Sequence, residues 1–193
     1  MPKETPQQRL KRYAKLVPDE DAIRLLLNAL EHTETDLADY SVALIGQTFV
    51  ERALELAILA KLAPFDEEAN RQIFSYDSNG PASDFAAKIK IGYVLGLFGP
   101  QTKKDLNLIR EVRNAFAHSL QAISFKTQEV AEMCKLFSLQ PMVRIRIAGV
   151  SQASRSRYIE VTTILAGRLK IAIERTPLVD QITAVEMLRR GLP

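Results

Sequence analysis

Residues 36–62 read DLADYSVALIGQTFVERALELAILAKL, and this stretch decides the class of fold. Its apolar side chains recur at helical spacing and cover nearly the whole circumference, which is typical of a helix at the centre of a bundle. The polar side chains fall within one narrow stripe at about 100° of rotation per residue. This stripe, which faces either solvent or another polar element, consists of Ser41, Thr48, Glu51, Arg52 and Glu55.

Helical signals continue on both sides of this central segment. Capping residues, prolines and apolar spacing predict further helices at about 66–74, 84–98, 102–118, 127–137 and 157–174. Ser83 is the expected N-cap of the helix at 84–98, and Thr102 to Asp105 resembles a capping box for the next one. Residues 142–147 alternate as a strand does, but a lone strand has no partner in the chain, so we interpret them as a linker, an edge or a helix start.

The length of 193 residues suits one domain. We expect an all-α, single-domain bundle of about seven or eight helices. Its parts are N-terminal helices in 1–34, a bundle core in 35–175 and a C-terminal helix in 176–193.

Several features of the sequence favour a cytoplasmic location. Cys134 is the only cysteine, so no internal disulfide can form, and its helical surroundings indicate a buried, inert thiol. The N-terminus has no apolar signal-peptide core. The most apolar stretch carries Glu51, Arg52, Glu55 and Lys61, charges that are costly in hydrocarbon. We therefore expect a cytoplasmic protein with no membrane partner.

The net charge of +3 is unevenly distributed. Residues 141–193 contain nine basic and four acidic residues, whereas 21–140 contain twelve basic and sixteen acidic ones. A basic end on an acidic body indicates either an anionic partner such as RNA or a solvated helix face.

The common catalytic signatures are missing from the sequence. There is no phosphate-binding loop, dinucleotide fingerprint or serine elbow. The two histidines, His32 and His118, are far apart, and neither has a second ligand at metal spacing. We expect no metal and no cofactor.

One segment, LIREVRNAFAHS at 108–119, places polar residues unusually. Its core face is Ile109, Val112 and Phe116, and Arg113 falls beside that face rather than on the exposed side. A charge there needs a partner, because an unpaired buried charge is costly. Glu51 or Glu55 could supply it. A second polar line, spaced i, i+4 and i+8, consists of Arg110, Asn114 and His118.

The same segment resembles the Arg-x4-His motif of the HEPN superfamily, here Arg113-Asn114-Ala115-Phe116-Ala117-His118. The preceding NGPASDFAAKI at 79–89 and YVLGL at 93–97 resemble bacterial proteins related to the mannitol operon repressor. The resemblance covers roughly residues 35–175.

This resemblance implies a helical bundle that often forms a homodimer and, in its catalytic members, a metal-independent endoribonuclease. His118 would move a proton to or from the ribose 2′-hydroxyl or the leaving oxygen. Arg113 would stabilise charge on the phosphate, and Asn114 would orient the histidine or the phosphate. Glu51, Glu55 and Arg110 would be supporting residues. The products would carry cyclic phosphate ends.

Two points keep another interpretation open. Arg113 and His118 lie about 140° apart on an ideal helix, so either the helix loosens near His118 or the site is composite across a dimer. Alternatively, Arg113 ties two core helices through Glu51 or Glu55, and His118 caps a helix end. The protein would then be a non-catalytic, mannitol-repressor-like regulator or a scaffold, with a regulatory or antitoxin protein as partner.

Overall fold

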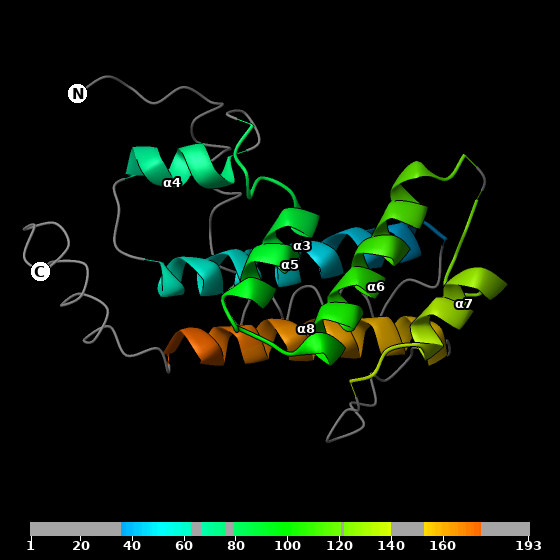
Figure 1. Cartoon of the computed structure of the whole chain (residues 1–193). Coiled ribbons are helices and arrows are strands. Elements are labelled where there is room, and N and C mark those ends of the chain that lie inside the picture. The colour runs from blue at the N-terminus through cyan, green and yellow to red at the C-terminus, as the bar shows by residue number, and fades with distance from the viewer. Residues whose placement is uncertain (1–35, 63–66, 76–78, 121, 140–152, 175–193) are drawn as a thin grey trace, which may run out of the picture.

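The computed structural model describes residues 36–62, 67–75, 79–120, 122–139 and 153–174. These residues form six α-helices and no strand (Figure 1). The predicted all-α class is therefore confirmed for the described part of the chain. The helices expected in 1–34 and 176–193 and the alternating segment at 142–147 lie outside the described residues, so the total of seven or eight helices stays a prediction. The six helices are α3 (Asp36–Lys61), α4 (Glu67–Phe74), α5 (Phe85–Val94), α6 (Pro100–His118), α7 (Gln128–Lys135) and α8 (Ala153–Glu174).

Helices α3 and α8 lie side by side, and α5 and α6 cross them on one side (Figure 1). The close approach of α3 and α8 is set at Gly46, where a Cβ atom would lie only 2.8 Å from Cε1 of Tyr158. The hydroxyl of Tyr158 donates to the carbonyl oxygen of Ala43 at 2.9 Å. The ring is fully buried, so this hydrogen bond satisfies its polar end.

The central position predicted for residues 36–62 is confirmed. Val50, Leu54 and Ile58 of α3 are 0% exposed and belong to one hydrophobic core shared by all six helices. Burying such a side chain contributes about 1.5–3 kcal/mol. Its two exposed large apolar side chains, Leu44 and Ile45, both lie in its first half. No helix among the described residues is both long and apolar enough to cross a bilayer.

Three predicted helix starts were wrong in detail, and the largest difference is that α8 begins at Ala153 instead of Arg157. Asp84, not Ser83, is the N-cap of α5, and its carboxylate accepts the amide of Ala87 at 2.7 Å. Helix α6 begins at Pro100, before the expected capping box, because proline at the first helical position needs no amide partner. The carboxylate of Asp105 is therefore free to bond elsewhere.

Helix α5 also ends four residues before the predicted Phe98. Gly96 adopts a positive φ of 69°, which ends the helix in a Schellman arrangement. The amide of Leu97 donates to the carbonyl of Gly92 at 3.0 Å, and that of Gly96 donates to the carbonyl of Tyr93 at 3.1 Å. The chain then turns directly into α6.

Asp39 and Arg155 form a buried ion pair between α3 and α8. Nε of Arg155 lies 3.4 Å from Oδ1 of Asp39, and their side chains are 2% and 4% exposed. Oδ2 of Asp39 accepts the amide of Phe125 at 2.9 Å. These contacts join the connection after α6 to the α3–α8 pair.

Asp105 anchors the chain that follows α7. It is 1% exposed, and its two carboxylate oxygens accept the amides of Ser138 and Leu139 at 2.8 and 2.9 Å. The hydroxyl of Ser138 donates to Oδ2 at 2.9 Å. On the other side of the segment, Arg157 donates to the carbonyl oxygens of Phe137 and Leu139. One buried carboxylate thus ties α6 to the end of α7.

We expect Asp105→Ala to lower the free energy of unfolding by about 3 kcal/mol, because it strands two peptide amides at a buried site. Urea unfolding followed by far-UV circular dichroism measures the change. Asp84→Ala is the matched control, because it removes an exposed cap worth only about 1 kcal/mol. Equal losses in the two variants would contradict the anchoring role of Asp105.

Candidate functional site

Helix α6 has the predicted core face, and this face fixes the rotation of the helix. Ile109, Val112 and Phe116 are at most 2% exposed. The ring of Phe116 packs edge-on against Tyr40 of α3, with centroids 5.3 Å apart. The positions of the polar residues on α6 follow from this packing.

Arg113 lies on the flank of the core face and is half-buried, as the sequence predicts. Its Nη1 atom donates to Oδ1 of Asn114 at 3.2 Å. Its charge also acts on buried Tyr158. Burial raises the pKa of Tyr158, nearby Cys134 raises it further, and the charge of Arg113 offsets part of this rise. A guanidinium is therefore held at the edge of the core beside an amide.

The predicted partners of Arg113 are wrong. Glu51 and Glu55 pair with Lys88 of α5, whose Nζ lies 2.9 Å from Oε1 of Glu51 and 3.0 Å from Oε2 of Glu55. The side chain of Lys88 is 5% exposed. Glu51 and Glu55 of the α3 stripe thus face α5, where a lysine already balances them, whereas Ser41 and Thr48 of the stripe are exposed.

These groups belong to a larger set, which we call the α3–α5 ion cluster: Gln47, Glu51, Arg52, Glu55 and Lys88. Nε2 of Gln47 donates to Oε2 of Glu51 at 3.3 Å, and Arg52 pairs with Glu55. Burial by itself lowers the pKa of Lys88, but charge attraction and hydrogen bonds from Glu51 and Glu55 outweigh burial and hold it above its ordinary value of 10.5. Lys88 is therefore charged at neutral pH.

The ion cluster changes the interpretation of Arg113. Among the described residues, no carboxylate forms an ion pair with this guanidinium, although one was expected. Within that part of the chain its hydrogen-bond partner is the neutral amide of Asn114. A group of this kind, half-buried and unneutralised, is suited to binding an anion such as phosphate.

His118 is exposed and is the last residue of α6. The amide of Ser119 donates to the carbonyl of Ala115 at 3.0 Å, so the regular helical turn continues up to His118. Of the two alternatives given for Arg113 and His118, loosening of the helix near His118 is therefore wrong. On a regular helix His118 lies about 140° and 7.5 Å away from Arg113, so the two side chains diverge within one chain.

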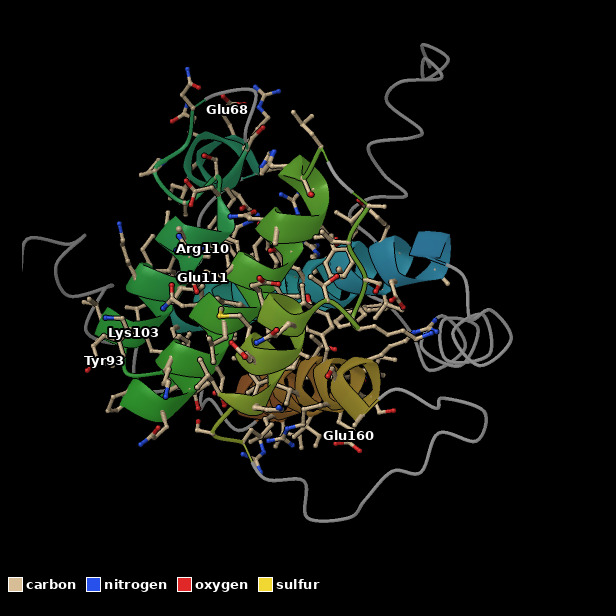
Figure 2. All side chains as sticks on the ribbon, turned by 90° about the vertical axis from the view of Figure 1, so that its right-hand side faces the viewer. Glu68, Tyr93, Lys103, Arg110, Glu111 and Glu160 are labelled. Carbon is tan, nitrogen blue, oxygen red and sulfur yellow. The ribbon has the colours of Figure 1, made fainter. Side chains whose placement is uncertain are left out.

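Arg110 lies one helical turn before Asn114, on the predicted second polar line. Its Nε atom is buried and has no hydrogen-bond partner among the described residues. Figure 2 shows Arg110 next to exposed Glu111, with Lys103 nearer the start of the helix. The polar line therefore adds a second cation one turn before Asn114.

The thiol of Cys134 is buried, as predicted. Burial raises its pKa to about 12, although Arg157 lowers it in part. A thiol with this pKa is protonated at neutral pH and is a poor nucleophile. Within the described ranges, no three histidine, cysteine or acidic side chains gather as metal ligands would.

Comparison with known proteins gives a plain result. No family model, curated protein or solved structure matches this chain. The HEPN resemblance therefore rests only on the residues of this chain.

Lys88 is the site-related residue that the sequence interpretation missed. It lies three residues after Phe85 and four before Gly92, both buried, so it falls within the apolar stripe of α5. A lysine at such a position needs a buried acid partner. That signal was present in the sequence, although it does not show which acids lie opposite Lys88.

Proposed function

We propose that this protein is a metal-independent endoribonuclease of the HEPN type, with a site formed by Arg113, Asn114 and His118. The observation that carries the proposal is the guanidinium of Arg113, which has no ion-pair partner among the described residues and is hydrogen-bonded to Asn114 on a helix that ends in exposed His118. The structural role considered for Arg113 was an ion pair with Glu51 or Glu55. Both of these carboxylates are bound to Lys88.

The reaction we propose is internal transfer at an RNA phosphate. The 2′-oxygen attacks phosphorus, the bond to the 5′-oxygen breaks, and a 2′,3′-cyclic phosphate forms. His118 takes the proton from the 2′-hydroxyl or gives one to the leaving oxygen. Arg113 stabilises the charge that builds up on the phosphate oxygens, and Asn114 positions its guanidinium.

The divergence of Arg113 and His118 supports a site shared by two copies. Because one regular helix cannot aim both side chains at the same phosphate, Arg113 of one copy would act with His118 of the other. A two-fold dimer would then hold two equivalent sites. We expect sedimentation to show a dimer at micromolar concentration.

Mixing two inactive variants tests this arrangement. Arg113→Gln and His118→Ala should each be inactive alone, because both shared sites lose one group. After unfolding and refolding together, half of the dimers are mixed and hold one intact site of two, so we expect about a quarter of wild-type cleavage. Cleavage of a fluorescent RNA measures the recovery.

The matched control for this mixture is the double variant Arg113→Gln with His118→Ala, refolded with wild type. Here the mixed dimers have no intact site, and only wild-type homodimers cleave. No recovery in the first mixture, with each variant folded and dimeric, would contradict a shared site.

The second candidate function is a non-catalytic, mannitol-repressor-like regulator or scaffold. Exposed apolar side chains favour it, namely Val94 at 84% and Leu120 at 104% exposure. Apolar groups this open are typical of surfaces that bind another protein when they lie together with complementary groups.

A further inference from the structure

The turn between α5 and α6 exposes apolar and cationic side chains together, far along α6 from His118. Tyr93 is 37% and Val94 is 84% exposed, and Lys90 and Lys104 are exposed as well. Nζ of Lys103 lies over the ring of Tyr93, 4.1 Å from its centroid (Figure 2). We call these five residues the cationic tip.

The shape of the cationic tip is fixed by its own packing. The ring of Phe98 lies 6.5 Å from that of Tyr93. It also lies against Gly92, where a Cβ atom would come within 2.9 Å of both Phe98 and Leu54. Together with the positive φ of Gly96, these contacts hold the turn in one conformation, and a preorganised surface binds at a lower cost in entropy.

The charge of the tip is uncompensated. No acidic residue occurs in the sequence between Phe85 and Lys104. The fourth lysine of this stretch, Lys88, is balanced by the α3–α5 ion cluster, whereas Lys90, Lys103 and Lys104 form no ion pair within the described part of the chain. A partner that supplies negative charge would be complementary to this surface.

We propose that the cationic tip is a docking surface for an acidic protein segment that carries an apolar side chain. Val94 and the edge of Tyr93 provide the apolar contact, and the three lysines contact flanking carboxylates. This surface is separate from the site proposed for RNA cleavage and does not depend on it.

The chemistry of the tip favours a protein over other anionic partners. A single-stranded nucleic acid needs an open aromatic face, but Lys103 lies over that of Tyr93, and Val94 offers no stacking surface. A membrane needs several inserted apolar side chains, and only Val94 is almost fully open at the tip. One exposed aliphatic side chain on a helix end that carries exposed lysines matches one apolar side chain flanked by acids.

The test measures binding of four probes to the full chain by fluorescence anisotropy at low salt. The probes are a helical peptide of glutamates with leucine at every fourth position, polyglutamate, oligouridine RNA, and phosphatidylglycerol vesicles. We expect the glutamate–leucine peptide to bind most tightly. We expect Lys90→Glu with Lys104→Glu to weaken its binding at least about 10-fold, and Val94→Ser to weaken it about 5-fold.

Matched controls make the same changes elsewhere on the molecule. Lys126→Glu with Lys135→Glu changes the charge equally at exposed positions, and Leu136→Ser removes another exposed apolar group. Both should bind as wild type does. Absence of peptide binding, equal binding of polyglutamate, tighter binding of RNA or vesicles, or an equal loss in the controls would each overturn the proposal.

Discussion

His118→Ala is expected to lower the rate of RNA cleavage by about 10²–10⁴-fold, the usual contribution of a positioned proton-transfer group. The fold should be almost unaffected, because His118 is exposed at the end of α6. Purified protein is incubated with a mixed RNA pool, and cyclic phosphate ends are scored. Activity should persist in EDTA, because the sequence has no histidine at metal-ligand spacing.

His32→Ala is the matched control, because His32 is the only other histidine of the chain. It should cleave as wild type does. Cleavage that persists in purified His118→Ala would point to a contaminating nuclease and remove the assignment. A wild-type protein that cleaves no RNA would favour the regulator.

Lys88→Met is expected to lower the free energy of unfolding by about 3 kcal/mol, because it leaves Glu51 and Glu55 without their cation. The loss lies at the lower end of the range for broken buried ion pairs, since the two glutamate side chains are 24% and 17% exposed and keep some hydration. Urea unfolding at neutral pH measures it. Lys90→Met, an exposed change on the same helix, should have almost no effect.

The effect of pH gives a second measurement for Lys88. Its pKa is raised in the folded state, so the ion cluster stabilises the fold fully below the ordinary pKa of 10.5. The stabilisation is lost as pH rises through the higher, folded-state pKa. The difference in stability between wild type and Lys88→Met should therefore shrink in strong alkali. A constant difference would show that lost packing, rather than charge, causes the destabilisation.

The central helix and the core face of α6 could be predicted from periodicity alone. Buried positions recur every three to four residues along a single helix. The spacing of apolar residues such as Leu54, Ile109 and Phe116 therefore predicts that they are buried. The same reasoning predicted that Arg113 needs an acid partner and offered Glu51 or Glu55. It did not identify Lys88, because the choice depends on which helix crosses α3 at that point.

That crossing is decided by Gly92, which lets α5 approach Leu54 and so brings Lys88 beside the carboxylates. In a hydrophobic repeat, glycine counts only as a weak helix former. The repeat does not show which helix packs against Gly92. The early end of α5 has a similar cause. It depends on the positive φ of Gly96, which ends the helix before the predicted Phe98.

The relation between Arg113 and His118 was only partly predictable. The angle of about 140° follows from helix geometry and was available from the sequence. Whether the helix stays regular depends on its last hydrogen bonds, and the bond from Ser119 to Ala115 decides this. Because the helix is regular, Arg113 and His118 of one chain do not form a site together. The proposed site is therefore shared by two chains.

The contact between Gly46 and Tyr158 has an evolutionary consequence. A side chain at position 46 needs the space that the Tyr158 ring occupies, and a smaller residue at 158 would leave a void above a bare glycine. Each single step between the two solutions passes through a less stable protein. Positions 46 and 158 should therefore covary among relatives of this chain, so a tyrosine kept at one predicts a glycine kept at the other.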